Sequence, residues 1–295
     1  MDESAPAPPP APPPASASAP PPKPSSNLAV RLLTAGVAVP GLLALLYLAP
    51  SWAFLLLVFF AAAVAGSELV AMTMPGERVL QTWGVLATLG LTVLFTYYAT
   101  DARIVVSALV VLVVVGMLLG LARPDPIERS GARIAWLVAG PLYLGLFISS
   151  VGRLHLTGGA HGPSWVVLCM MIAWFGDTGG YFAGRAFGKH KLYEKVSPKK
   201  TIEGSFGGLA GSVIGALVAH FWYLPTLQLV DGVLLALVGG ALGQAGDLCE
   251  SLVKRSTGVK DSGWIVPGHG GILDRIDALM FVGATVWAYT AWIGG

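Results

Sequence analysis

The sequence predicts an all-α polytopic membrane protein, and three observations support that fold class. Of the 295 residues, 55% are apolar and only 12% are Asp, Glu, Lys or Arg, against about 25% charged in an ordinary soluble domain. The mean hydropathy is +0.71. Apolar runs recur whose length, roughly 20 residues, lets a helix cross about 30 Å of hydrocarbon. A water-soluble globular fold is therefore excluded.

About nine such runs follow one another along the chain. The predicted transmembrane helices have approximate bounds 28–49, 51–72, 79–98, 103–121, 132–151, 164–183, 204–224, 230–252 and 273–293. Two of these boundaries are open to a second interpretation. Pro50 is compatible with a kink as well as a chain break, and Gly179 and Gly180 interrupt the sixth run.

The first 27 residues differ in kind from the rest of the chain. From residue 5 to residue 26 they are almost wholly Pro, Ala and Ser, a composition that has no apolar face to bury and predicts an extended, disordered tail. The tail holds no apolar segment of the kind that a signal peptide requires. We therefore divide the chain into a tail, 1–27, and a membrane domain, 28–295.

The positions of the basic residues predict the orientation, because cytoplasmic loops are enriched in Lys and Arg. With nine spans and a cytoplasmic tail, 16 of the 18 basic residues fall on the inside, and only Arg103 and Arg153 fall outside. We therefore expect a multi-pass inner (plasma) membrane protein whose two long polar loops, 184–203 and 254–271, face the cytoplasm.

Charge and cysteine content exclude several function classes. The formal net charge of +2 is too small to predict nucleic-acid binding. The two cysteines, Cys169 and Cys249, lie in apolar stretches without disulfide or metal-ligand spacing, and the five histidines are scattered. The chemistry is therefore expected in the charged segments.

One charged segment spans residues 247–277. Asp247, either Glu250 or Ser251, and Lys254 are spaced to share one face at the end of the eighth predicted helix. Asp274 and Asp277 begin the ninth helix, where the helix dipole favours carboxylates. A short connector joins these two acidic helix ends, so they should lie close together.

Carboxylates gathered at a membrane boundary repel each other and resist desolvation, which costs about 2.5–3.5 kcal/mol for one Asp at a helix centre and less near the interface. A divalent cation relieves that cost, and hard oxygen ligands shared with substrate phosphates favour Mg²⁺. The alternative is that Asp247 and Asp274 only form interfacial salt bridges with Lys254, Arg255 or Arg275.

The connector contains the sequence Pro-Gly-His-Gly-Gly over residues 267–271. Glycines let backbone N–H groups approach an anion closely, and the following helix N-terminus adds its positive field. This pattern predicts a polyphosphate-binding turn that includes Gly270 and Gly271. His269 either orients a phosphate or is a hydrogen-bonded structural histidine.

A second charged segment spans residues 177–203. Asp177 and Arg185 lie on one helix with a stripe of glycines that permits close packing. A basic run follows and ends in Lys199, Lys200 and Thr201, which either hold an anionic headgroup or nucleotide phosphate, or form a solvated cytoplasmic loop. Glu68, inside the second apolar run, is a further intramembrane acid, either in a packing hydrogen bond or at the site.

These segments resemble the phosphatidate cytidylyltransferase family, also called CDP-diacylglycerol synthase. The residues that match the family signature at its spacing are Ser251, Lys254, Arg255, Lys260, Asp261, Pro267, His269, Gly270, Gly271, Asp274, Arg275 and Asp277. The Ser-Pro-Lys-Lys-Thr stretch at 197–201 is also similar, so about 120 carboxyl-terminal residues carry the resemblance plainly. One departure is Val266, where the family usually has Leu, Ile or Phe.

The resemblance implies an enzyme that converts CTP and phosphatidate to CDP-diacylglycerol and pyrophosphate. It implies Mg²⁺ held by Asp247 and Asp274, an optional K⁺ ion, and a homodimer in the lipid bilayer. We expect Asp247, Lys254 and Asp274 to be catalytic. Substrate binding is expected from Asp177, Arg185, Lys199, Lys200, Thr201, Ser251, Arg255, Lys260, Asp261, His269, Gly270, Gly271, Arg275 and Asp277.

Three alternative functions are compared with this interpretation. A polyprenol kinase also uses CTP, but lacks the full Lys-Asp to Asp-Arg-x-Asp signature. A CDP-alcohol phosphotransferase would need Gly-x-x-Ala-Arg after Asp274 and Asp277, and the chain does not contain it there. A transporter also carries intramembrane acids, but internal repeats would be expected in its two halves.

Overall fold

The computed structural model describes residues 28–265 and 270–293, with side chains from residue 36 onward. The predicted tail and His269 lie outside this part of the chain. The elements, in order, are α1 (Leu28–Tyr47), α2 (Ser51–Thr73), α3 (Arg78–Tyr98), α4 (Ala102–Ala122), α5 (Ile127–Thr157), the 3₁₀ turn η1 (Gly159–His161), α6 (Gly162–Phe187), β1 (Lys191–Tyr193), β2 (Ser197–Thr201), α7 (Ile202–Val218), the π-helical turn η2 (Ala219–Tyr223), α8 (Leu229–Ser256) and α9 (Leu273–Trp292).

The helical fold class is confirmed, and the protein is a multi-pass membrane protein. Within residues 28–265 and 270–293, seven helices are long and apolar enough to cross a membrane, namely α2 to α8, with α6 and α7 extended by their flanking turns. The helices α1 and α9 are not among them. Nine membrane crossings therefore stay a prediction.

The structure answers both questions that the sequence left open about helix boundaries. Pro50 precedes α2 with extended backbone, φ −60° and ψ 147°, so the chain breaks there. In contrast, α6 runs without interruption through Gly179 and Gly180. The helix α5 is longer than the apolar run from which it was predicted, because its polar first turns are helical beyond the apolar stretch.

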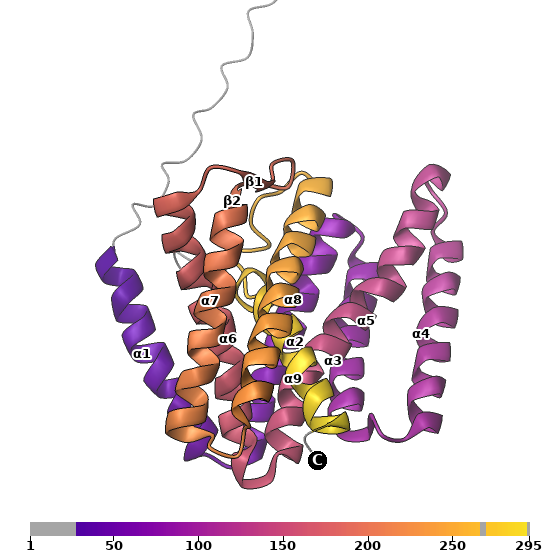
Figure 1. Ribbon diagram of the computed structural model, residues 1–295. Helices are drawn as coiled ribbons and strands as arrows, with labels where there is room; N and C mark the ends of the chain where they lie inside the picture. The colour runs from indigo at the N-terminus through magenta and orange to yellow at the C-terminus, as the bar shows by residue number, and fades with distance from the viewer. Residues whose placement is uncertain (1–27, 266–269, 294–295) are drawn as a thin grey trace, which may run out of the picture.

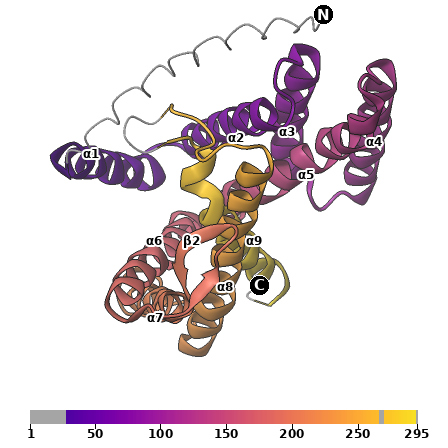
Figure 2. The same cartoon turned by 90° about the horizontal axis from the view of Figure 1, so that it is seen from above.

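The helices form two groups that are clear when the molecule is seen from above (Figure 2). One group is α2 to α5, with α4 at its outer edge, and the other is α6 to α9 (Figures 1 and 2). The helix α5 joins them by packing on both α6 and α9. Ile148, Ile172 and Val282 of the shared core are at most 4% exposed, and Phe147 stacks on Phe281 with ring centroids 4.6 Å apart.

Glycines allow the helices α6 and α7 to pack closely against each other. A Cβ atom added at Gly211 would overlap the backbone carbonyl of Phe175, and one at Gly179 would overlap the carbonyl of Gly207. Only glycine lets two helix backbones approach so closely. The predicted small-residue stripe therefore holds α6 against α7 and fixes where the polar ends of these helices meet.

Candidate active site

A short β-hairpin covers the ends of α6, α7 and α8 (Figures 1 and 2). Its strands are antiparallel, with Lys191 opposite Thr201. The Glu203 carboxylate accepts hydrogen bonds from the His190 ring at 2.6 Å and from the backbone N–H of Lys189 at 3.1 Å. Thr201 Oγ1 accepts from the Gly204 N–H and caps α7. The basic run thus forms an ordered hairpin, whose Lys191, Lys195 and Lys199 are exposed.

A cavity of about 370 Å³ lies between this hairpin and the helices α6, α7 and α8. We call it the hairpin pocket. It is lined by Gly176, Asp177, Gly180, Tyr181, Gly184, Arg185, Leu192, Lys199, Lys200, Thr201, Gly204, Ser205, Gly208, Gln244 and Asp247. Six of the predicted site residues, separated by up to 70 positions in sequence, are therefore brought to one cavity.

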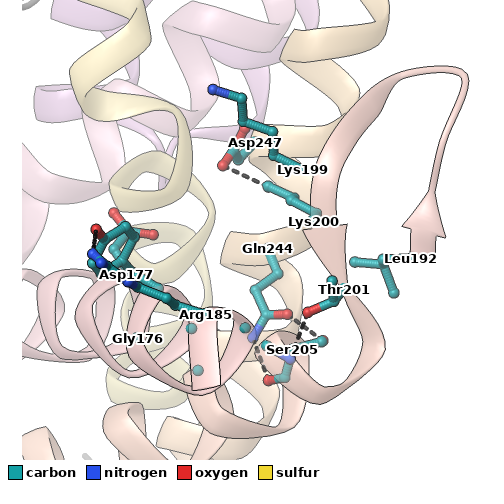
Figure 3. Close-up of a pocket in the computed structure, with 15 residues that line it drawn as sticks. Gly176, Asp177, Arg185, Leu192, Lys199, Lys200, Thr201, Ser205, Gln244 and Asp247 are labelled. Carbon is teal, nitrogen blue, oxygen red and sulfur yellow. Dashed lines mark hydrogen bonds and ion pairs between the residues drawn. The ribbon is translucent and has the colours of Figure 1, made fainter. Parts of the chain in front are cut away.

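Opposite charges meet in the hairpin pocket. Lys200 Nζ donates a hydrogen bond to Asp247 Oδ2 at 2.6 Å (Figure 3), so β2 is tied to α8 through a charge pair. On α6, Arg185 donates to the Tyr181 hydroxyl at 3.1 Å, and its side chain is exposed. The pocket thus combines cations that suit phosphate with a carboxylate that suits a metal ion.

The amide of Gln244 shapes the other side of the pocket. Its Nε2 donates to the Ser205 carbonyl at 3.1 Å, and its Oε1 accepts from the Ser205 hydroxyl (Figure 3). Ser205 is on α7 and Gln244 is on α8. The pair links the two helices beside the cations.

A second polar group surrounds the start of α9, and we call it the α9 cluster. Lys254 Nζ donates to Asp274 Oδ1 at 2.6 Å and lies 3.2 Å from Glu250 Oε1. Asp274 Oδ2 accepts from the backbone N–H groups of Ser262 and Gly271, both at 2.9 Å. The salt bridge that sequence analysis held open for Asp274 is therefore present, with Lys254 as its partner.

The two polar groups adjoin at Asp247. The Ser251 hydroxyl donates to Asp247 Oδ1 at 3.3 Å, one turn along α8 toward Lys254. Asp247 also repels the carboxylates of Asp177 on α6 and Asp277 on α9. Acids from three helices therefore gather where the hairpin pocket meets the α9 cluster.

Some predicted residues lie apart from these contacts. Arg255 is exposed and donates to the carbonyl of Val259. Lys260, Asp261 and Arg275 are also exposed. His269 cannot be placed because it is outside the described residues. The structure thus brings together the acids, Lys200 and Lys254. Arg275 is exposed but lies close enough to Asp177 to attract its carboxylate, whereas Arg255 and Lys260 stay on the surface.

The N–H groups that open α9 have partners within the protein. Those of Ile272 and Leu273 donate to the Glu68 carboxylate at 3.0 and 2.9 Å, and that of Gly271 donates to Asp274. They are therefore occupied by carboxylates, whereas the glycine pattern predicted that they would hold a phosphate.

Asp247 and Asp274 offer oxygen donors of the kind that a divalent cation takes. Asp247 Oδ1, Asp247 Oδ2 and Asp274 Oδ1 each accept one hydrogen bond and so keep a lone pair for a metal. Across residues 28–265 and 270–293, no three His, Cys, Asp or Glu side chains form a preassembled metal site. Mg²⁺ commonly takes one or two carboxylates and completes its shell with water and substrate phosphates, so the chemistry of these donors is compatible with that ion.

Sequence reasoning missed Tyr181, Ser205, Gln244 and Ser262. Tyr181 lies one helical turn after Asp177 on α6. Ser205 and Gln244 lie within apolar runs, and an isolated amide in such a run is an available signal, since intramembrane polar residues face the bundle interior. Ser262 directly follows the signature Lys-Asp pair, but its role depends on contacts with Glu68, 194 residues away.

Comparisons with known proteins agree with this geometry. A family model described as "Cytidylyltransferase family" matches residues 29–293. The chain belongs to this family. The match includes the hairpin pocket and the α9 cluster as well as the helices α2 to α5, so both helix groups are part of the family fold.

Relatives that are named for an enzymatic activity are similar to this chain over different lengths. A protein of Staphylococcus saprophyticus named phosphatidate cytidylyltransferase is 34% identical over 254 residues, which cover 86% of this chain and 95% of that protein. One of Staphylococcus epidermidis with the same name is 47% identical over 123 residues, 42% of this chain. In that alignment the chain spans about half the relative's length, 47%.

Proposed function

We propose that the protein transfers CMP from CTP to phosphatidate and so forms CDP-diacylglycerol and pyrophosphate in phospholipid biosynthesis. The observation that supports this most is the hairpin pocket, where Lys199, Lys200 and Arg185 face Asp177 and Asp247 at the membrane boundary. An enzyme that joins a lipid phosphate to a nucleotide needs a site that offers cations for the phosphates, carboxylates for a metal ion and access from the bilayer. The relatives named above support the same reaction.

The cations of the pocket are assigned to the phosphate of phosphatidate. Lys200 is half-buried and already held toward Asp247, and Lys199 and Arg185 line the same cavity. Charge-assisted hydrogen bonds from such groups are about twice as strong as neutral ones. These residues would hold the lipid phosphate in line with the α-phosphorus of CTP.

The chemical step needs no general base from the protein. A phosphate monoester oxygen is already ionised near neutral pH, so it attacks the α-phosphorus while the bond to the pyrophosphate oxygen breaks. Asp247 and Asp274 would hold Mg²⁺, which would supply positive charge to stabilise the reacting phosphates. Lys254 fixes the Asp274 carboxylate, and the exposed Arg255 and Lys260 are assigned to the leaving pyrophosphate.

We further propose that Mg²⁺ is the required ion and that K⁺ is an optional companion. The active enzyme would be a homodimer in the inner membrane, with its site facing the cytoplasm. The clustering of the charged loops at one end of the bundle supports that orientation (Figure 1). Labelling of single cysteines introduced at Lys195 and at Asp101 from either side of the membrane tests it.

The proposed function is tested with purified full-length protein, CTP, Mg²⁺ and phosphatidate, followed by mass analysis of the lipid products. We expect CDP-diacylglycerol and an equal amount of pyrophosphate, and no product when CTP or Mg²⁺ is omitted. An Asp274→Asn variant that inserts normally but keeps near-normal pyrophosphate release would contradict the assigned role of Asp274.

A further inference from the structure

Glu68 connects the two helix groups at the start of α9. It lies near the end of α2, and only 5% of its surface is exposed. Its Oε1 accepts from the Ile272 N–H at 3.0 Å, and its Oε2 accepts from the Leu273 N–H at 2.9 Å and from the Ser262 hydroxyl at 2.9 Å. A carboxylate in α2 therefore caps a helix that belongs to the other group.

The loop before α9 is shaped to fit around this carboxylate. A Cβ atom added at Gly263 would lie 2.6 Å from Glu68 Oε1, and one added at Gly271 would lie 2.5 Å from Oε2. Neither distance allows a side chain without displacement of the carboxylate or the loop. Gly263 and Gly271 therefore both lie directly against the Glu68 carboxylate.

The same contacts lead from Glu68 to Asp274. The Ser262 hydroxyl lies 2.9 Å from Glu68 Oε2 and 3.0 Å from Asp274 Oδ2, so its single proton is shared between the two carboxylates and links them. Gly271 donates to Asp274 Oδ2, and the next two N–H groups donate to Glu68. Any shift of this turn away from Glu68 would therefore also move the groups that hold Asp274.

We propose that Glu68 is a positioning residue for the reaction. It fixes the first turn of α9 and the Ser262 hydroxyl, and through them the orientation of Asp274. It lies outside the lining of the hairpin pocket, so it acts without touching substrate there. The part of this inference that concerns catalysis rests on the proposed function, whereas the anchoring of α9 does not.

A carboxylate suits this role for a chemical reason. Each oxygen is an acceptor only, so it can accept the N–H groups of α9 and the hydroxyl together. An amide in its place would turn one acceptor into an NH₂ group that faces an N–H donor. Glu68→Gln should therefore lose at least one hydrogen bond while keeping the side-chain volume, and Glu68→Asp should keep the charge but fall short by one methylene.

The test measures backbone exchange and activity on the full-length protein in detergent. Hydrogen–deuterium exchange over peptides covering 270–275 should be about tenfold faster or more in Glu68→Gln, because charge-assisted hydrogen bonds are lost. Activity should fall by about 10- to 100-fold, in line with losses at residues that orient metal ligands. The Mg²⁺ concentration for half-maximal rate should rise, with little change in the KM for phosphatidate.

Ser262→Ala provides a second variant that removes only a hydroxyl. Its effect on the Mg²⁺ dependence should be non-additive with that of Glu68→Gln, because both act on Asp274 through one network. Glu77→Gln is the matched control: Glu77 pairs with Arg123 at 3.1 Å, on the loop after α2. It should leave exchange over 270–275 and the Mg²⁺ dependence unchanged.

Three results would overturn the proposal. The first is unchanged exchange over 270–275 in Glu68→Gln. The second is faster exchange with unchanged activity and Mg²⁺ dependence. The third is lost activity in Ser262→Ala and Glu68→Gln with strictly additive effects and an unchanged Mg²⁺ dependence. If wild-type protein forms no CDP-diacylglycerol, the proposed function fails, and the exchange experiment alone decides whether Glu68 anchors α9.

Discussion

The two helix groups are built by different means. In α6 to α9, glycines bring α6 and α7 into backbone contact, and charged side chains gather at the hairpin pocket and the α9 cluster. In α2 to α5, α4 fully buries only Leu112, Gly116 and Gly120, and it leaves side chains such as Leu118 exposed. The difference agrees with the proposal that α6 to α9 carry the chemistry and that α2 to α5 support them from one side.

The largest effect is expected at Asp247, where the two polar groups meet. Asp247→Asn should lower kcat/KM by about 10²–10³-fold, since it removes a carboxylate that is assigned to hold Mg²⁺. The matched control is Asp231→Asn at the other end of α8, where Asp231 accepts from the Tyr289 hydroxyl at 2.7 Å. A steady-state assay of pyrophosphate release compares them, and equal losses in both variants would contradict the assignment.

A smaller effect is expected at the pocket cation. Lys200→Met should raise the KM for phosphatidate by about 10- to 100-fold, because a charge-assisted hydrogen bond to phosphate is lost. Lys195→Met, in the exposed turn of the same hairpin, removes an equal charge and should change the KM little. A similar shift in both would mean that the hairpin acts only through its overall charge.

The glycine contact is tested by a pair of alanine substitutions. Gly211→Ala should destabilise the protein by about 1–3 kcal/mol, because its Cβ would overlap the Phe175 carbonyl. Gly90→Ala in α3 meets no atom within 4 Å and should be neutral or slightly stabilising, since alanine favours helix. Thermal unfolding in detergent measures both, and an unaffected Gly211→Ala would show that α6 and α7 can separate without cost.

The smallest effect is expected on the outer face of α4. Leu118 is 57% exposed, and Leu118→Ile should change the free energy of unfolding by no more than about 0.5 kcal/mol and leave activity unaltered. Unfolding and activity assays on the same sample check this. A marked loss would indicate that this face contacts protein, as in a dimer, rather than lipid.

Much of the helical architecture could be predicted from the sequence. The length of the apolar runs located the helices, because a membrane span must satisfy its backbone hydrogen bonds within one segment. The charged segments also predicted that Lys200, Asp247, Lys254 and Asp274 belong to the site. These are local patterns, and each was visible within a window of about 30 residues.

The partners of these residues could not be predicted in the same way. The pairing of Lys200 with Asp247 depends on how the hairpin lies over α8, and Glu68 meets Ile272 across more than 200 residues. Such contacts follow from how the helices pack, and local patterns in the sequence do not reveal that packing. The start of α9 shows the consequence, because a glycine pattern there suits a phosphate, whereas the N–H groups of Gly271, Ile272 and Leu273 bind carboxylates in the fold.

The most direct test of the account follows the label of CTP. Purified protein is incubated with phosphatidate, Mg²⁺ and CTP labelled at either the α- or the γ-phosphate, in parallel with the Asp247→Asn variant. We predict that the α label enters the lipid, that the γ label leaves as pyrophosphate, and that both transfers are lost in the variant. Entry of the γ label into lipid would show a kinase reaction and contradict CMP transfer at this site.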